Sequence, residues 1–138
     1  AQILSEVQTL CEAFGTAMVW ITHDLAVISG LADRIAVMYA GKIVETGSVA
    51  ETIERPIHPY TMGLIGSVPS RNRRGSLLAQ IPGMTPSLAR LAPGCAFAPR
   101  CSRADATCRA VAPDFTAFDD ARFARCHHPL VAPAPVAA

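Results

Sequence analysis

One apolar run near the beginning of the chain limits the folds that this sequence can adopt. Residues 17–21, Ala-Met-Val-Trp-Ile, are consecutive apolar residues, and segments of helical character lie on both sides of them. A short run that is apolar at every position is typical of a strand buried on both faces of a parallel sheet. The sequence therefore predicts an α/β fold in which this strand has neighbouring strands.

The histidine that follows this run is a candidate ligand-binding residue. Ligands of open α/β sheets bind beyond the carboxyl ends of the strands, and His23 lies at that position, directly after Thr22. An isolated histidine after a strand is more often a structural or surface residue. Its position alone therefore leaves the function of His23 open.

The segments around this run have the patterns of regular elements. Apolar residues recur at helical spacing over residues 3–14, and Gly15 is suited to end that helix. We expect this helix to pack against the sheet, with Cys11 as a small core residue on its apolar face. Asp24 is predicted to cap a second helix that runs to about Asp33.

A hairpin and two further helices are predicted next. Residues 34–39 and 43–45 are rich in β-branched side chains and flank a turn that contains Gly41, a pattern that predicts an antiparallel edge. Ser48 and Glu51 have the spacing of a capping box that opens a short helix to about Glu54. Pro59 is placed to begin another helix, which runs to about residue 67.

Charge and hydropathy limit the classes of partner. The net charge of +1 gives no electrostatic preference for nucleic acid or for an anionic membrane surface. The arginines at positions 71, 73 and 74 are interpreted as a solvated linker, and no apolar run approaches the length of a membrane span. We expect a soluble cytosolic protein. Because the chain begins with Ala1 in a helix that leads to an unpaired strand, we also expect an N-terminal portion to precede it.

Four cysteines in the C-terminal half are the strongest compositional signal. They are Cys95, Cys101, Cys108 and Cys126. Four thiolates can hold a tetrahedral zinc ion or an iron–sulfur cluster, and a proline-rich segment of this size needs such a staple in place of a large core. The C-x2-C pairs of structural zinc sites and the bacterial ferredoxin pattern are both absent. A cytosolic location disfavours disulfides. Disulfides, idle thiols, and His127 or His128 as ligands remain alternatives.

Two stretches together resemble a known family. Ile-Thr-His-Asp-Leu at 21–25, followed by Ala-Asp-Arg-Ile-Ala-Val-Met-Tyr-Ala-Gly-Lys-Ile-Val-Glu-Thr-Gly at 32–47, resembles the ATPase subunits of ABC transporters from their switch histidine onward. The resemblance covers residues 1–55. It implies the C-terminal part of a P-loop (RecA-like) core that binds ATP with Mg²⁺. It further implies that His23 hydrogen-bonds the ATP γ-phosphate and helps to position the attacking water.

The next stretch narrows the resemblance to one subfamily. Arg-Pro-Ile-His-Pro-Tyr-Thr at 55–61 is similar to the His-Pro-Tyr segment of the ATPase subunits of oligopeptide and dipeptide importers, and so is the cysteine-rich extension. In some members the four cysteines bind a [4Fe–4S] cluster. The resemblance therefore favours a cluster over zinc for Cys95, Cys101, Cys108 and Cys126. His58-Pro59-Tyr60 is interpreted as a helix start and docking surface.

The chain also departs from the complete family pattern. It contains no G-x-x-x-x-G-K-[ST] loop, no Ser-Gly-Gly-Gln signature and no acidic strand end, which phosphoryl transfer by P-loop ATPases requires. We therefore expect it to be inactive alone. The predicted organisation is an ATPase-core part at 1–55, the His-Pro-Tyr helix and linker at 56–74, a small irregular cysteine-rich extension at 75–129 and a disordered tail at 130–138.

The resemblance implies partners and a location. The partners are a second ATPase subunit, transmembrane permease subunits and, indirectly, a periplasmic or extracellular peptide-binding protein, with no nucleic acid. The implied location is the cytoplasmic, inner face of the cell membrane. The alternative function is a small iron–sulfur or zinc-binding module with a structural or redox role.

Overall fold

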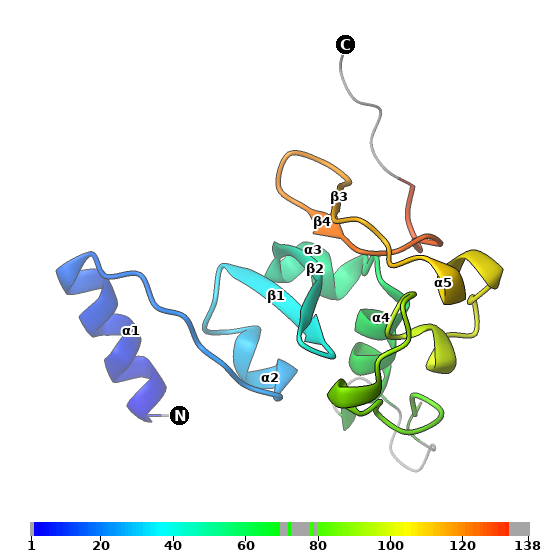
Figure 1. The fold of residues 1–138 in the computed structure, drawn as a ribbon. Helices are drawn as coiled ribbons and strands as arrows, with labels where there is room; N and C mark the ends of the chain where they lie inside the picture. Colours follow the sequence, from blue (N-terminus) through cyan, green and yellow to red (C-terminus); the bar gives the residue numbers. More distant parts are fainter. Residues whose placement is uncertain (1, 70–71, 73–77, 79, 133–138) are drawn as a thin grey trace.

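The computed structural model describes residues 2–69, 72, 78 and 80–132 as a mixed α/β fold (Figure 1). Its centre is a four-stranded antiparallel sheet in the order β1-β2-β4-β3. The strands are β1 (Arg34–Tyr39), β2 (Lys42–Ser48), β3 (Thr116–Ala117) and β4 (Phe123–Ala124). The helices are α1 (Gln2–Phe14), α2 (Leu25–Ile28), α3 (Val49–Glu54), α4 (Pro59–Gly66) and α5 (Ala106–Ala110), with 3-10 turns η2 (Leu88–Arg90) and η3 (Ala98–Arg100).

The predicted hairpin is confirmed. β1 and β2 pair in antiparallel register, and β1 alternates strictly between exposed and buried residues. Ala40 and Gly41 form the connection with φ values of 48° and 77°. Positive φ at both central residues gives a turn whose twist matches that of the strands, and glycine adopts this conformation without steric cost.

A β-bulge interrupts the hairpin and changes the direction of one charged side chain. Val37 pairs with Glu45 while Met38 pairs with Ile43, so Val44 is the extra residue on β2. An extra residue bends the strand and re-aims the side chains beside it. As a result Val44 and Glu45 are both buried, although they are consecutive.

The predicted starts of α3 and α4 are confirmed. The Ser48 hydroxyl accepts a hydrogen bond from Glu51 N (3.2 Å) and lies 2.7 Å from Glu51 Oε2, to which it donates. Ser48 is therefore the N-cap that the spacing predicts, but Glu51 bonds to the Ser48 hydroxyl in place of the backbone N–H that a full capping box uses. Pro59 occupies the first turn of α4, where its missing N–H costs nothing.

The predicted strand at residues 17–21 is wrong for this chain. Residues 16–22 are extended but belong to no sheet, and Val19 and Ile21 are 90% and 93% exposed. A strand needs backbone partners on at least one edge. Among the described residues, the sheet contains only β1 to β4.

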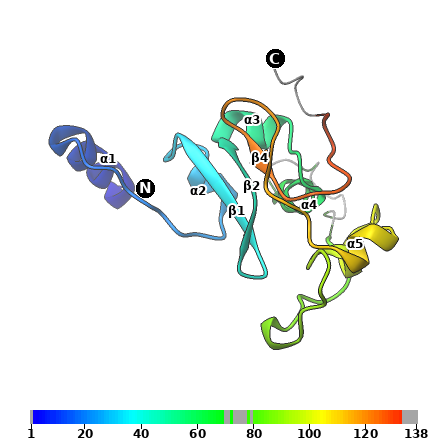
Figure 2. The ribbon, with the colours of Figure 1, turned by 45° about the horizontal axis from the view of Figure 1, so that its top comes forward.

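The helix at residues 3–14 forms as predicted, but its predicted packing on the sheet is wrong. Figures 1 and 2 show α1 apart from the sheet, with the extended segment leading from it to α2. Leu10 and Phe14 are exposed, and Cys11 is only half-buried. The Gln8 amide donates to Gly30 O (3.1 Å), a contact with the turn after α2. The second helix is also shorter than predicted, since α2 ends at Ile28.

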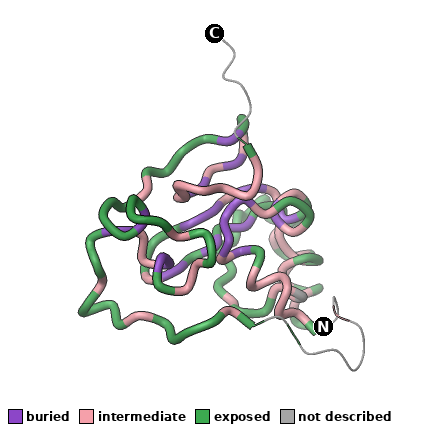
Figure 3. Tube along the Cα trace, turned by 90° about the vertical axis from the view of Figure 1, so that its right-hand side faces the viewer, coloured by how far each residue is buried: buried purple, intermediate pink, exposed green. Residues whose placement is uncertain are grey.

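The C-terminal half contributes strands and side chains to the centre of the fold. β4 extends the predicted hairpin into a larger sheet, and Arg125 N donates to Val44 O (2.9 Å). The main core contains β1, β2 and α3 residues together with Phe97, and a second cluster joins Ile57, Phe118 and Ala124. Figure 3 shows the buried residues gathered at the middle of the trace.

Two predictions fall mainly outside the described residues. These are the arginines at 71, 73 and 74 and the end of the tail at 133–138. Leu130 is described, and its N–H donates to Ile57 O (2.8 Å). Within the described part of the chain, no helix is long and apolar enough to cross a membrane.

Candidate functional site

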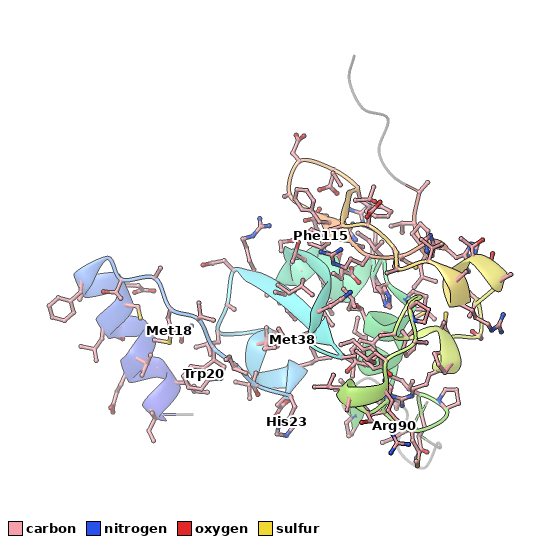
Figure 4. The ribbon with its side chains drawn as sticks, viewed as in Figure 1. Met18, Trp20, His23, Met38, Arg90 and Phe115 are labelled. Atoms are coloured by element: carbon pink, nitrogen blue, oxygen red, sulfur yellow. The ribbon has the colours of Figure 1, made fainter. Side chains whose placement is uncertain are left out.

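His23 lies between the extended segment and α2, and it is exposed. Figure 4 shows its ring beside α2, on the side away from the sheet. Its neighbour Thr22 orders the backbone locally, because the Thr22 hydroxyl accepts a hydrogen bond from Asp24 N (3.0 Å). A histidine in this position is free to meet a group that approaches from outside this chain.

A buried carboxylate connects the hairpin to the His-Pro-Tyr segment. Glu45 is fully buried, and its two oxygens accept hydrogen bonds from Ile57 N (2.8 Å) and His58 N (2.9 Å). Two backbone donors on one carboxylate fix the chain just before α4. This contact explains how β2 determines where the helix begins.

An arginine from the C-terminal half balances this buried charge. The Arg122 guanidinium is 4.0 Å from Glu45 Oε1 and also donates to the carbonyl of Arg55. Arg122 is only 4% exposed. Among the described residues, Arg122 Nε has no hydrogen-bond partner and lies 4.0 Å from Asp119 Oδ2, so this buried pair is only partly satisfied. Its two members come from opposite halves of the sequence.

The histidine of the His-Pro-Tyr segment faces inward. His58 is 1% exposed, and its Nδ1 accepts a hydrogen bond from Tyr60 N (3.0 Å) as the cap of α4. Burial lowers the pKa of His58 to about 4. The ring is therefore neutral near pH 7, and its Nδ1 is able to accept the hydrogen bond from Tyr60 N. The helix start is therefore confirmed, while the His58 ring faces the protein interior instead of an exposed docking surface.

Aromatic rings attach this helix start to the cysteine-rich extension. Phe97 lies between Cys95 and Cys101 in the sequence, and its ring centroid is 5.2 Å from Tyr39, 5.4 Å from Tyr60 and 5.6 Å from His58. These separations are within the range of favourable edge-to-face and tilted pairs. The segment from Cys95 to Cys101, which we call the first cysteine loop, is thus anchored on β1 and α4.

Arg100 holds a second loop beside this aromatic cluster. Its guanidinium donates to Pro82 O (2.8 Å) and Ile81 O (3.1 Å), and it approaches the Tyr39 hydroxyl at 3.5 Å. Ile81 is one of the apolar side chains that pack on the main core. One arginine next to a cysteine therefore orders residues 81–82, near the beginning of the extension.

The four cysteines that the sequence singles out differ in burial. All are free thiols, with Cys108 buried and the other three half-buried. Cys95 N donates to Cys108 O at 2.7 Å, which joins two of the cysteine segments. The pKa of Cys126 is raised to about 11, chiefly by burial and to a smaller extent by the thiols of Cys95, Cys101 and Cys108.

The two adjacent histidines have different surroundings. His127 Nε2 lies 2.9 Å from the carbonyl of Val111, and His128 Nε2 lies 2.9 Å from Asp105 Oδ2. Asp105 caps α5, because its Oδ1 accepts a hydrogen bond from Cys108 N (2.8 Å). This backbone donor lowers the pKa of Asp105 to about 2.

A small cavity lies between the hairpin turn and the first cysteine loop. Its volume is about 90 Å³, and its lining includes Lys42, Cys95 and Arg125. The Arg125 guanidinium also sits 5.0 Å above the ring of Phe115, which Figure 4 labels above the sheet. Sites for nucleotides and similar ligands have volumes of about 300–1,000 Å³. This cavity is therefore too small for a nucleotide.

Sequence reasoning missed the polar residues that connect the parts of the fold. Glu45 and Arg122 are 77 positions apart, so no local pattern relates them. Arg100 bonds to backbone carbonyls, and every residue has one, so the sequence does not indicate which carbonyls it contacts. Asp105 was detectable, because an aspartate three residues before Cys108 has the spacing of a helix N-cap.

Comparisons with known proteins place these features in context. Residues 44–108 match the family described as "Oligopeptide/dipeptide transporter, C-terminal region". The chain is 47% identical over 132 residues to a putative peptide import ATP-binding protein of Brucella ovis, which covers 91% of this chain and 39% of that protein. The end of β2, the His-Pro-Tyr helix and the first three of the four cysteines lie within residues 44–108, whereas β1 lies before them.

Two further relatives give the same result. The chain is 41% identical over 130 residues to the oligopeptide transport ATP-binding protein OppD of Salmonella typhimurium, covering 94% of this chain and 38% of that protein. It is 46% identical over 127 residues to a probable peptide ABC transporter ATP-binding protein of Sinorhizobium fredii, covering 91% of this chain and 38% of that protein. The chain thus spans somewhat more than a third of the length of these relatives.

Proposed function

Because the chain belongs to the oligopeptide/dipeptide transporter family of ATP-binding proteins, we propose that it forms part of the ATP-binding subunit of an ABC importer for oligopeptides or dipeptides. The observation that carries this proposal is the 47% identity over 91% of the chain to a peptide import ATP-binding protein. The comparisons give no support to the alternative of an independent iron–sulfur module.

In this proposal, nucleotide chemistry depends on segments outside this chain. A phosphate-binding loop, a signature segment and an acidic strand end would complete the P-loop core and hold ATP with Mg²⁺. The exposed segment at residues 16–22 would become a strand of that core once a neighbouring strand satisfied its backbone. The chain alone would be inactive as an ATPase.

His23 is the residue that would act on the nucleotide. It is exposed at the end of the extended segment, so its imidazole is accessible to a phosphate held by another part of the protein. We propose that it hydrogen-bonds the ATP γ-phosphate and orients the attacking water. Such a contact stabilises the transition state by position and electrostatics.

The cysteine residues fit a metal group. Four free thiols influence one another electrostatically, and the backbone bond from Cys95 to Cys108 holds two of their segments together. We propose that Cys95, Cys101, Cys108 and Cys126 would hold a [4Fe–4S] cluster, with zinc as the alternative. Bound there, a cluster supplies a cross-link and a one-electron redox centre, while the aromatic contacts of Phe97 position the first loop.

We also propose the assembly and the organisation that the resemblance implies. A second ATPase subunit and transmembrane permease subunits would complete the importer on the inner face of the membrane, and a peptide-binding protein would deliver the substrate. Residues 1–55, 56–74, 75–129 and 130–138 would be the ATPase-core part, the helix with its linker, the extension and the tail. The β2–β4 pairing means that the extension would stay attached to the core part.

The assignment is tested in an assembled importer whose ATP-binding subunit contains these residues. His23→Ala is expected to leave ATP affinity nearly unchanged and to reduce peptide-stimulated ATP hydrolysis by roughly 100-fold, as removal of one transition-state hydrogen bond does. His127→Ala serves as the matched control and should retain full turnover. Unchanged turnover in His23→Ala would rule out this role for His23.

A further inference from the structure

The small cavity between the hairpin turn and the first cysteine loop has no role in the proposed function. Its volume is about 90 Å³, and it is bordered by the end of β1, the beginning of β2 and residues 91–97. Cys95 lines it, whereas the other three cysteines of the extension do not. The cavity is therefore not the space that a metal group on the four thiols would fill.

Most of the cavity lining is apolar. Tyr39 and Phe97 are both buried, and their ring centroids lie 5.2 Å apart in an edge-to-face pair. Val44 and Leu91 continue this apolar lining. An apolar cavity of about 150 Å³ is large enough to hold benzene. A cavity of about 90 Å³ therefore suits a hydrocarbon group of roughly four carbon atoms.

Two positive charges complete the lining. They belong to Lys42, at the start of β2, and Arg125, directly after β4. The hydrogen bond from Arg125 N to Val44 O (2.9 Å) holds the Arg125 backbone beside β2. Within the described part of the chain, neither cation forms an ion pair with a carboxylate. The cavity therefore has two positive groups without a negative partner.

Aromatic rings hold the Arg125 guanidinium in place. Its Cζ lies 5.0 Å from the centroid of the Phe115 ring, and Phe115 stacks on Phe123 with centroids 5.5 Å apart. A guanidinium over an aromatic face is attracted by the ring. Since this contact uses no N–H group, the donors of Arg125 stay available for a carboxylate, which arginine binds through two parallel hydrogen bonds.

We propose that this cavity binds a small aliphatic carboxylate. A branched alkyl group of about four carbons would lie against Tyr39 and Phe97, where it is removed from water. The carboxylate would accept charge-assisted hydrogen bonds from Lys42 and Arg125. A free branched-chain acid and the C-terminal residue of a peptide both present this chemistry. The proposal stands on the cavity and its two cations and does not depend on the importer function.

The test is a titration of the 138-residue chain with 3-methylbutanoate at pH 7, followed by amide chemical shifts in NMR spectra. Saturable shifts are expected at residues 42–44, 94–97 and 125. The neutral analogue of the same shape, 3-methylbutanamide, should bind at least roughly 10-fold more weakly, because it loses hydrogen bonds to a charged acceptor. Lys42→Gln and Arg125→Gln should each weaken carboxylate binding by a similar factor. Arg103→Gln, at an exposed position outside the cavity, is the matched control and should bind as the wild type does.

A peptide arm distinguishes the two sources of the carboxylate. Binding of alanylvaline, but not of its C-terminal amide, would support the site and identify a peptide end as its ligand, whereas binding of 3-methylbutanoate alone would support it with a free acid. Equal binding of 3-methylbutanoate and its amide would overturn the proposal, and so would equal losses in Arg103→Gln and Arg125→Gln. Absence of saturable shifts for both carboxylates in the folded wild-type chain, checked by circular dichroism, would overturn it as well. Because Lys42 is exposed on the hairpin, Lys42→Gln keeps the test decisive if Arg125→Gln does not fold.

Discussion

At the scale of single residues, Glu45 connects three parts of the fold. Its carboxylate satisfies Ile57 N and His58 N and faces the Arg122 guanidinium, all in the interior. The bulge at Val44 is what turns this side chain inward. A charged strand residue thereby becomes a buried link between β2, the start of α4 and Arg122.

Replacing Glu45 tests that role. Glu45→Ala leaves two buried N–H groups without their acceptor and removes the buried carboxylate beside Arg122, which keeps its bond to Arg55 O and its contact with Asp119. It is expected to lower the free energy of unfolding by about 3–5 kcal/mol. Urea denaturation followed by circular dichroism measures the change. Glu54→Ala, at an exposed position of α3, is the control and should change stability by less than about 0.5 kcal/mol. Equal effects of the two substitutions would contradict the role of Glu45.

His58 makes the stability of the fold depend on pH. Burial lowers the pKa of its ring from 6.5 to about 4, and the only charged side chain that bonds its backbone is Glu45 among the described contacts. The unfolded chain takes up a proton on His58 near pH 6.5, while the folded chain resists protonation until about pH 4. The contribution of His58 to stability is therefore complete above pH 6.5 and is lost as the pH falls toward 4.

The expected loss is about 3 kcal/mol, because each pKa unit corresponds to about 1.4 kcal/mol. His58→Asn keeps an acceptor for the α4 cap without a titrating ring. The difference in unfolding free energy between wild type and His58→Asn should shrink by about that amount between pH 7 and pH 4. Parallel pH profiles for the two proteins would show that the His58 ring does not carry this effect.

At the scale of elements, the close contact between the first cysteine loop and α5 depends on a glycine. A Cβ at Gly94 would lie 2.3 Å from Cys108 O and 2.5 Å from the backbone of Arg109. Backbone atoms cannot move aside as the end of a flexible side chain can. Gly94 therefore allows Cys95 and Cys108 to share a backbone hydrogen bond.

Gly94→Ala is expected to destabilise the chain by about 1–3 kcal/mol, the usual cost of overpacking. It should also weaken metal binding by the extension, since it separates two of the cysteine segments. Thermal unfolding and metal titration measure the two effects. Gly30→Ala, where an added Cβ meets nothing within 4 Å, is the matched control. A Gly94→Ala protein as stable as Gly30→Ala would disprove the close approach.

At the scale of the whole molecule, the sheet joins distant parts of the sequence while α1 stands apart. β4 pairs with β2, and Arg34 Nη2 of β1 donates to Ala121 O (2.8 Å) in the turn between β3 and β4. The segment at residues 16–22 has no such partners among the described strands, and Figure 4 shows Met18 and Trp20 along the connection between α1 and α2. Stability is therefore unevenly distributed over the molecule.

Amide hydrogen exchange of the 138-residue chain should show this division. Amides of β1 and β2 are expected to exchange only through rare opening of the sheet, whereas those of residues 17–21 should exchange at rates close to an unstructured peptide. Mass spectrometry of peptic fragments resolves the two regions. Protection of residues 17–21 equal to that of β2 would mean that this segment forms a strand after all.

The sequence by itself determined the local elements and the family. The hairpin, the N-cap at Ser48, the proline start of α4 and the helix at residues 2–14 are set by interactions within a few residues, so periodicity and turn chemistry were sufficient to predict them. The strand at residues 17–21 failed for the opposite reason, because a strand depends on partners that its own residues do not encode. His23 and the four-cysteine metal site remain predictions.

Only the tertiary structure decided how the two halves meet. The Glu45–Arg122 pair, the packing of Phe97 on the His-Pro-Tyr helix and the approach of His128 to Asp105 each join residues that are far apart in the sequence. Such contacts form only after the bulge in β2, the pairing of β4 with β2 and the close approach at Gly94 have brought distant segments together. Side-chain type alone defines which residues are able to interact, whereas the folded backbone determines which of them do.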